Sequence, residues 1–322
     1  MKPGEPVALG FDIGGSNTKF GLVNQWGEIS HAAEFSTGIK TGSLDHFVER
    51  LVKEMRSILG DAGVEVIGIG GTFLGWINET RTGPIFTMNA PALHGFNFKH
   101  LLEGEFHLPV VLHDDITAHT LAEYTWGSGR GTRRFMCLAM GTGLGAGVII
   151  DGQPLQFTGG CTGDAGHIIL RPGGPSCTSG CKGCGEALIG VAGIERLGWE
   201  KYQRRRPATE IIQKARSGSD PLAVEIMAEI GGYTGELLAS LSAIFFPTRI
   251  ALTGGTARAG DVLLHAARHR FEELVGDYHR TFSRLSNGEH PGVEIVPGEL
   301  KGETGVIGAV VDLFQSYRAI AL

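Results

Sequence analysis

The sequence predicts an α/β protein of two domains, each a sheet covered by helices. Strands, glycine turns and helices follow one another in two rounds, and each round opens with two strands joined by a tight turn, a pattern typical of α/β layers. The length of 322 residues exceeds one typical core and fits two domains. The 51 glycines have no Gly-X-Y period, so they indicate turns rather than a collagen-like fibre.

The first round consists of short apolar runs and one amphipathic segment. Apolar residues at 44, 47, 48, 51, 52, 55 and 58 recur at the helical period, Ser43 is suited to cap that helix, and Gly60 is expected past its end. A further helix is expected to run through Glu123. The strands are expected at 7–11, 20–23, 29–35, 64–69 and 110–112.

The second round repeats this order. Strands are expected at 135–139, 148–150 and 249–252, with a glycine turn at 141–147 between the first two. Helices are expected at 186–202, 221–246, 261–275 and 306–322. The two rounds therefore share one architecture, although no short repeat of fixed period is present.

Charge, hydropathy and cysteine count limit the class of protein. The 28 basic and 34 acidic residues give a net charge of −6, so nucleic acid is not expected as the principal partner. The sequence has no apolar run of about 18 residues and no signal-peptide pattern at its start, so neither a membrane span nor secretion is expected. The odd number of 5 cysteines favours a reducing compartment, the cytoplasm.

Three glycine turns follow strands, at 12–19, 141–147 and 253–256. Such turns expose backbone N–H groups that can bind phosphate. None is a GxxxxGK[ST] or GxGxxG motif, and a single glycine turn is more often a tight hairpin. Three in this order, on two repeated sheets, favour phosphate binding.

Carboxylates at two strand ends have a functional and a structural interpretation. Asp12 could hold Mg²⁺, or it could form an Asx turn. Asp114 and Asp115 follow an apolar strand and precede a helix. At the end of the strand, one carboxylate could take a proton from a substrate hydroxyl. Alternatively, it could cap the helix that begins at Ile116. The residue types alone leave these alternatives open.

The loop at 159–185 is rich in glycine, cysteine and proline. His167, Cys177, Cys181 and Cys184 offer one nitrogen and three sulfurs, a set that suits a tetrahedral structural zinc site. A metal would order a loop that packing cannot. The alternative is three free thiols on a mobile loop.

Several motifs resemble those of a known family. Residues 12–19 (Asp-Ile-Gly-Gly-Ser-Asn-Thr-Lys) resemble the DxGGT phosphate motif of sugar kinases with the actin-like fold. Residues 74–85 are similar to the PGxVD…TG segment of the ROK family (repressors, open reading frames and sugar kinases), and residues 111–123 to its VxNDANAAALGE segment. Residues 141–147 match its GTGxGxG loop, and residues 163–186 resemble its GExGH…GCxE segment. The resemblance runs from about Leu9 to Gly308.

This resemblance implies a fold and a set of site residues. The fold would be two actin-like (ribonuclease H-like) α/β domains with a central cleft, at 1–117 plus 305–322 and at 118–304. Asp115 would be the catalytic base. The sugar would be bound by Asn89, Asp114, Asp164, His167 and Glu186. ATP and Mg²⁺ would be bound by Asp12, Gly14, Gly15, Ser16, Asn17, Lys19, Thr142, Gly143, Gly254 and Gly255.

Some positions depart from the family pattern. Asp114 stands where Asn is usual, and an aspartate accepts hydrogen bonds but cannot donate them. Thr117 replaces a second Asn, and Asp164 replaces a sugar-contacting Glu that is one methylene longer. The usual CxCGxxGC segment has Ser179 at its middle position, with Cys181 two residues later. These changes leave the fold intact and the identity of the sugar unassigned.

We therefore expect an ATP-dependent kinase that phosphorylates the 6-hydroxyl of glucose or a related hexose. The alternatives are a kinase of fructose or of an N-acetylhexosamine (N-acetylmannosamine or N-acetylglucosamine), and a non-catalytic sugar sensor. The donor could be ATP, ADP or polyphosphate. Only eleven residues precede Asp12, which leaves no room for a helix-turn-helix domain and disfavours the sensor. A homodimer or homotetramer is expected from the resemblance.

Overall fold

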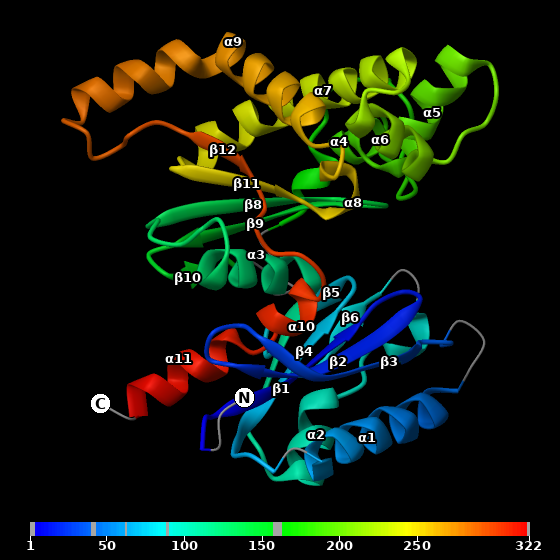
Figure 1. Cartoon of the computed structure of the whole chain (residues 1–322), viewed down its shortest axis with the longest axis vertical. Helices are drawn as coiled ribbons and strands as arrows, with labels where there is room; N and C mark the ends of the chain where they lie inside the picture. The colour runs from blue at the N-terminus through cyan, green and yellow to red at the C-terminus, as the bar shows by residue number, and fades with distance from the viewer. Residues whose placement is uncertain (1–3, 40–42, 62, 88–89, 157–162, 321–322) are drawn as a thin grey trace. The chain divides into compact units, whose positions relative to one another are not determined.

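A computed structural model describes residues 4–39, 43–61, 63–87, 90–156 and 163–320. Contacts within it group the chain into two compact units (Figure 1). The first unit comprises residues 1–130, 154–163 and 300–322, and the second comprises residues 131–153 and 164–299.

The first unit is built on a five-stranded sheet in the order β3-β2-β1-β4-β7. β1 pairs antiparallel with β2 and parallel with β4, and β4 pairs parallel with β7. The strands are β1 (Val7–Ile13), β2 (Asn17–Asn24), β3 (Ile29–Ser36), β4 (Val66–Phe73) and β7 (Val110–Asp114). All five predicted strands are present. A small separate sheet pairs β5 (Trp76–Ile77) with β6 (Pro84–Phe86).

Helices cover both faces of this first sheet (Figure 1). Val7, Leu9 and Phe11 lie in one apolar cluster with side chains of α1 and α2, whereas Ala8 lies in a second cluster with α10 and α11. This alternation is the period of two expected for a strand buried on both faces. The helices are α1 (Leu44–Asp61), α2 (Phe98–Phe106), α3 (Asp115–Trp126), α10 (Thr304–Gly308) and α11 (Val311–Ile320), with a 3₁₀ turn η1 (Pro91–Leu93).

The second unit repeats this topology, with a sheet in the order β10-β9-β8-β11-β12. β8 pairs antiparallel with β9 and parallel with β11, which pairs parallel with β12. The strands are β8 (Arg134–Met140), β9 (Leu144–Ile150), β10 (Gln153–Pro154), β11 (Arg249–Thr253) and β12 (Glu294–Pro297). The predicted repeat of two rounds is thus confirmed as one strand order used twice.

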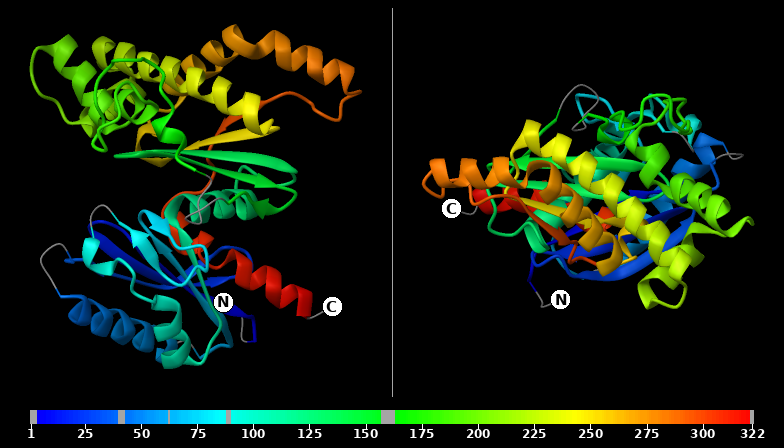
Figure 2. Two further views of the ribbon diagram at one scale, coloured as in Figure 1. Left: turned by 180° about the vertical axis from the view of Figure 1, so that it is seen from behind. Right: turned by 90° about the horizontal axis from the view of Figure 1, so that it is seen from above.

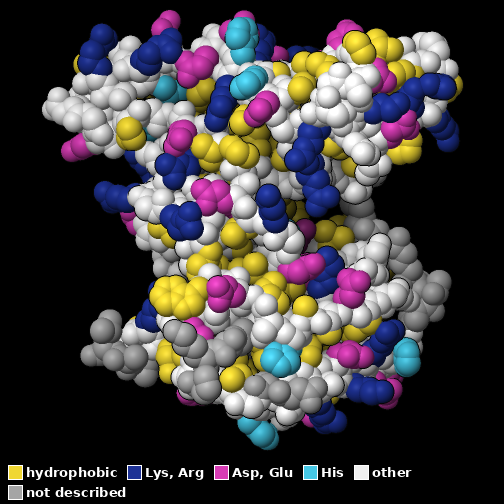
Figure 3. All heavy atoms as spheres, in the orientation of Figure 1, with side chains coloured by type: hydrophobic (Ala, Val, Ile, Leu, Met, Phe, Trp, Pro, Cys, Tyr) yellow, Lys and Arg dark blue, Asp and Glu magenta, His cyan; other side chains and the backbone are white. Residues whose placement is uncertain are grey.

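The remaining helices pack in the second unit, where the long α7 and α9 lie side by side (Figures 1 and 2). They are α4 (Gly185–Ile189), α5 (Val191–Tyr202), α6 (Ala208–Ser217), α7 (Pro221–Phe245), α8 (Gly254–Ala257) and α9 (Asp261–Leu285), with a 3₁₀ turn η2 (Ala165–His167). Figure 3 shows basic and acidic side chains interspersed on the visible face of each unit.

Several predicted bounds were wrong for identifiable reasons. The predicted helix at 186–202 is interrupted at Gly190, because the N–H of Val191 bonds to the carbonyl of Gly141 instead of continuing the helix of α4. The turn at 141–147 is shorter, since β9 begins at Leu144 and pairs with β8. The helix at 306–322 is two helices, α10 and α11. Ser43 does cap α1 through its hydroxyl, but Gly60 lies inside that helix.

Helix α3 lies where the predicted domain boundary falls. The division at 1–117 plus 305–322 and 118–304 stays a prediction, and the compact units differ from it by including all of α3 in the first unit. The reason is packing, because Ala122 of α3 lies in one apolar cluster with Val306 and Val310. Within the described residues, no helix is long and apolar enough to cross a membrane.

Candidate active site

Two adjacent carboxylates lie where β7 ends and α3 begins. Asp114 is the N-cap of α3, because its Oδ1 accepts from the backbone N of Thr117 at 2.8 Å and its Oδ2 from the Thr117 hydroxyl at 2.5 Å. The capping interpretation therefore holds for Asp114, which is buried. Asp115 is the first residue of the helix and is half-buried, so it is the more accessible member of the pair.

The surroundings of Asp115 favour its protonated form. Burial, together with the negative charges of Asp114 and Asp12, raises the pKa of Asp115 to about 7. Backbone hydrogen bonds from Ile116 and Gly75 oppose it. A carboxyl group with a pKa near 7 can accept a proton at neutral pH and release it again, as a general base must.

Asp12 lies at the end of β1 and is held from two sides. The parallel register of β1 and β4 places Asp12 beside Thr72, whose Oγ1 donates to Asp12 Oδ1 at 2.7 Å. On the other side, a Cβ atom at Gly305 would lie 2.6 Å from Asp12 Oδ2, so a side chain there would displace the carboxylate. The Coulombic effect of Asp12 on the pKa of Asp115 indicates that the two carboxylates share one region of the first unit.

The first glycine turn connects β1 to β2 and consists of Gly14, Gly15 and Ser16. It is closed by a bond from the N–H of Gly14 to the carbonyl of Asn17 at 3.1 Å, and the Thr37 hydroxyl donates to the carbonyl of Gly14 at 2.8 Å. Lys19 follows on β2, where its Nζ lies 2.9 Å from Glu303 Oε2. The hydrogen bond to Glu303 raises the pKa of Lys19, so its positive charge is retained beside the turn.

The other two glycine turns meet at one edge of the second sheet. The turn of Gly141, Thr142 and Gly143 is closed by a bond from the N–H of Gly141 to the carbonyl of Gly143 at 2.9 Å. Gly254 has φ +87°, and a Cβ atom there would lie 2.4 Å from the carbonyl oxygen of Met140. At Gly255, no atom of the described residues lies within 4 Å of such a Cβ. The backbone of the third turn therefore lies against the start of the second.

The residues predicted to bind the sugar in the second unit lie beside these turns. Asp164 Oδ1 and His167 Nδ1 are 2.7 Å apart across η2. Glu186, at the start of α4, accepts from the backbone N of Leu144 at 3.3 Å, and its Oε2 would lie 3.2 Å from a Cβ at Gly143. Glu186 therefore connects the segment predicted to bind sugar with a turn predicted to bind phosphate.

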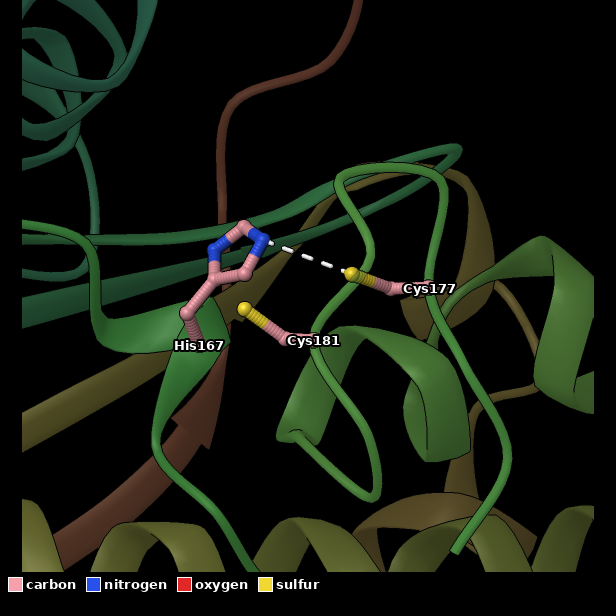
Figure 4. A group of neighbouring side chains, drawn as sticks. All are labelled: His167, Cys177 and Cys181. Atoms are coloured by element: carbon pink, nitrogen blue, oxygen red, sulfur yellow. Dashed lines mark hydrogen bonds between the residues drawn. The ribbon is translucent and has the colours of Figure 1, made fainter.

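Three of the four predicted zinc ligands come together. Ligand atoms of His167, Cys177 and Cys181 all lie within 4.8 Å of one another, and in Figure 4 their side chains point toward one another. His167 Nε2 is 3.5 Å from Cys177 Sγ, about the separation expected for two ligands of one tetrahedral zinc ion. Cys184 is not in this group, although it is buried and its thiol is hydrogen-bonded to that of Cys177.

The electrostatics of this group suit metal binding. Burial opposes ionisation of Cys177, but backbone N–H groups of Ser179 and Cys181 and the neighbouring side chains of Cys184 and His167 lower its pKa overall. Metal ions bind the thiolate form of cysteine. The donor set therefore fits a zinc ion, with Cys184 next to the group as a candidate fourth ligand.

Three residues that contact the candidate site were not predicted from the sequence, and one predicted residue is not described by the structure. Asn89 lies outside the described residues. Thr72, Gly305 and Glu303 were not identified, because their neighbours Asp12 and Lys19 are distant in the sequence and only the strand register and the return of the C-terminal segment bring them together. The sequence offered one indication of such a role, because Thr72 is a polar residue in the otherwise apolar run of β4.

Known proteins match the chain over most of its length. The model of the ROK family matches residues 8–315. A glucokinase of Halalkalibacterium halodurans is 29% identical, with 93% of this chain and 92% of that protein covered. An N-acetyl-D-glucosamine kinase of Photobacterium profundum is 28% identical, with 76% of this chain and 83% of that protein covered.

Solved structures match it as well. A ROK family glucokinase from Streptomyces griseus, crystallised in complex with glucose and AMPPNP, superposes with a TM-score of 0.76 at 26% identity, with 95% of this chain and 98% of that chain covered. The predicted fold class of two actin-like α/β domains is therefore confirmed.

Proposed function

This chain belongs to the ROK family, and from that membership and the site we propose that it is an ATP-dependent hexose kinase. It transfers the γ-phosphoryl group of ATP to the 6-hydroxyl of glucose or a related hexose. The similarity to a glucokinase over more than nine-tenths of both chains supports the reaction. The structural likeness to a glucokinase holding glucose and AMPPNP supports the two substrates.

The observation that carries the chemistry is the environment of Asp115. Asp115 takes the proton of the sugar 6-hydroxyl while that oxygen attacks the γ-phosphorus and ADP leaves with the bridging oxygen. Its pKa of about 7 lets it accept this proton at neutral pH. Because phosphoryl transfer has a loose transition state, the rest of catalysis is positioning and neutralisation of charge.

The phosphates and their cation are assigned to the glycine turns and to Asp12. The Asp12 carboxylate is a hard oxygen ligand with one oxygen already fixed by Thr72, which fits Mg²⁺. Mg²⁺, when bound, neutralises the charge that develops on the phosphates. The remaining residues proposed to hold ATP are Gly14, Gly15, Ser16, Asn17, Lys19, Thr142, Gly143, Gly254 and Gly255.

The sugar is assigned to five polar side chains. Asp164, His167 and Glu186 lie close together in the second unit, and Asp114 and Asn89 complete the set. Asp114 would bind the sugar as an acceptor only, since its carboxylate has no proton to donate. Structural zinc is assigned to His167, Cys177 and Cys181, with Cys184 as the fourth ligand.

Replacement of Asp115 tests the proposal. Asp115→Ala should lower kcat at least ~10³-fold while glucose affinity, measured by calorimetry, is largely retained, since removal of a general base costs roughly 10²–10⁴-fold. Asp277→Asn, at a carboxylate exposed on α9, is the matched control and should leave kcat unchanged. An unchanged rate in Asp115→Ala would overturn the assignment of the base.

The favoured alternative substrate is an N-acetylhexosamine. The 28% identity to an N-acetyl-D-glucosamine kinase supports it. A panel of glucose, fructose, mannose, N-acetylglucosamine and N-acetylmannosamine, with ATP, ADP and polyphosphate as donors, separates the candidates by kcat/KM. Sugar binding without turnover by any donor would instead support a sensor.

We also propose self-association and a reducing compartment. Leu274, Tyr278, Phe282 and Leu285 form an exposed apolar stripe along α9, which supports a homodimer or homotetramer. Light scattering should give a multiple of the chain mass of 34.2 kDa, and Leu285→Glu should reduce the measured mass. A monomeric wild type would contradict this. The thiols of Cys177, Cys181 and Cys184 are not in disulfides, which fits the cytoplasm.

A further inference from the structure

The first observation is the partner of Asp12 on the neighbouring strand. Thr72 is completely buried, and its hydroxyl donates to Asp12 Oδ1 at 2.7 Å. The two residues are register partners in the parallel pair of β1 and β4, so the backbone ladders hold them side by side. A threonine on a strand has a restricted χ1 angle. The hydroxyl is therefore a fixed donor rather than one that adapts to its acceptor.

The second observation is the close approach of α10 to the other carboxylate oxygen. A Cβ atom at Gly305 would lie 2.6 Å from Asp12 Oδ2 and 3.2 Å from Asp12 Oδ1. Atoms never approach so closely without displacement, so the absence of a side chain at Gly305 permits the observed orientation. Thr72 and Gly305 together leave the Asp12 carboxylate little freedom to rotate.

The third observation is that the segment leading into α10 is itself fixed. The backbone N of Leu300 donates to Glu123 Oε1 at 3.0 Å, and the hydroxyl of Thr304 is hydrogen-bonded to His119 Nδ1. His119 and Glu123 lie four and eight residues after Asp115 on α3, hence on the same face of that helix. The helix that begins with Asp115 therefore also anchors the segment that lies against Asp12.

We infer that Thr72 is a positioning residue that orients Asp12 toward the divalent cation of the nucleotide, with Gly305 limiting the carboxylate from the opposite side. This inference rests on the proposed function, because it concerns the cation that accompanies ATP. The hydrogen bond from the Thr72 hydroxyl to Oδ1 keeps Asp12 in one rotamer. The remaining lone pairs of the Asp12 carboxylate therefore point in a constant direction. Binding of the cation then requires no reorientation of the carboxylate.

The test compares Thr72→Val with Thr72→Ser. Valine matches the shape of threonine but has no donor, whereas serine retains the hydroxyl. Two readouts are needed: the Kd of ATP by calorimetry with and without Mg²⁺, and the Mg²⁺ concentration that gives half-maximal kcat at saturating ATP. Thr72→Val should weaken Mg²⁺-dependent ATP binding at least about tenfold, because hydrogen bonds to charged groups are among the stronger ones. Thr72→Ser should stay within about threefold of the wild type, and the KM for glucose should not change.

Other outcomes decide against the inference. Equal Mg²⁺ dependence in Thr72→Val and the wild type would overturn it, and so would equal losses in Thr72→Val and Thr72→Ser, since these would indicate packing rather than the donor. Gly305→Ala is the second variant and should also raise the Mg²⁺ requirement; an unaltered requirement contradicts the role of Gly305. If the wild type phosphorylates no sugar, the proposed function fails, but the calorimetric comparison still decides whether Thr72 orients Asp12.

Discussion

The proposed base, Asp115, has neighbours that also have structural roles. Asp114 caps α3 and at the same time places a negative charge beside Asp115. Wild-type kcat/KM should therefore fall on the acid side with an apparent pKa of about 7, because protonated Asp115 cannot act as a base.

Asp114→Asn separates the two roles of that residue. Asparagine caps a helix about as well as aspartate, but it removes a charge that raises the pKa of Asp115. The acid limb of kcat/KM should move to lower pH, and the melting temperature should change little. An acid limb that stays in place would contradict the contribution of the Asp114 charge to the pKa of Asp115.

The raised pKa of Asp115 also has a cost in stability. The folded-state pKa of about 7 lies above the ordinary value of 3.8, so stability is complete below the ordinary value and is lost as the pH rises through the folded pKa. Asp115→Asn should therefore increase the free energy of unfolding above pH 7 by roughly 1–3 kcal/mol, since one pKa unit corresponds to about 1.4 kcal/mol and water screens a half-buried group. Urea unfolding at pH 8 and pH 4 measures this, and an equal effect at both pH values would contradict it.

At the level of single residues, the sequence identifies the groups proposed to do the chemistry better than the residues that position them. Asp12, Asp114 and Asp115 follow apolar strands and could be named from their position. Thr72 and Glu303 could not, because a register between β1 and β4 and a contact across more than 280 residues are properties of the folded chain.

The glycine turns are the elements on which the ATP assignment depends, and they differ in their tolerance of a side chain. Gly254→Ala should lower the melting temperature and weaken ATP binding, because Gly254 has φ +87° and its Cβ would lie 2.4 Å from a carbonyl oxygen. A cost of roughly 1–3 kcal/mol is expected from such strain. Gly255→Ala is the matched control, since no atom of the part of the chain that the structure describes lies within 4 Å of its Cβ. Equal melting temperatures for the two variants would refute this account of the turn.

The cysteine-rich loop gives a prediction of metal content. Protein purified without chelator should contain about one zinc ion per chain, because a closed structural site retains its metal. Less than about 0.2 zinc per chain would count against the site. Cys181→Ser should reduce both the zinc content and the melting temperature, whereas Cys137→Ser, in β8 and outside the group, should retain the zinc.

Element boundaries were less predictable than element types. Apolar periodicity identified α1, α7 and α9, but α9 continues to Leu285, ten residues beyond the predicted end, where Gly276 and His279 are still buried. Helix α6 was missed, although Pro207 and the αL residue Gly218 bracket it. Helix α6 has only ten residues, so its apolar residues complete too few helical turns to show a clear period.

For the whole molecule, the decisive feature is that one strand order occurs twice. The two sheets that share it are formed by separate parts of the chain. The repeat could be predicted from the order of strands, turns and helices. The return of residues 300–322 to the first unit brings Glu303 and Gly305 to Lys19 and Asp12. The C-terminal segment is thus part of the proposed nucleotide site, which composition and periodicity could not indicate.

The most direct test of the central claim is identification of the product. The purified protein should be incubated with glucose, ATP and Mg²⁺, and the mixture analysed by ³¹P and ¹H NMR. The account predicts ADP and a sugar phosphorylated at the 6-hydroxyl in the wild type, and neither in Asp115→Ala beyond a trace. ATP that stays intact with every sugar of the panel, or a phosphate on another hydroxyl, would contradict it.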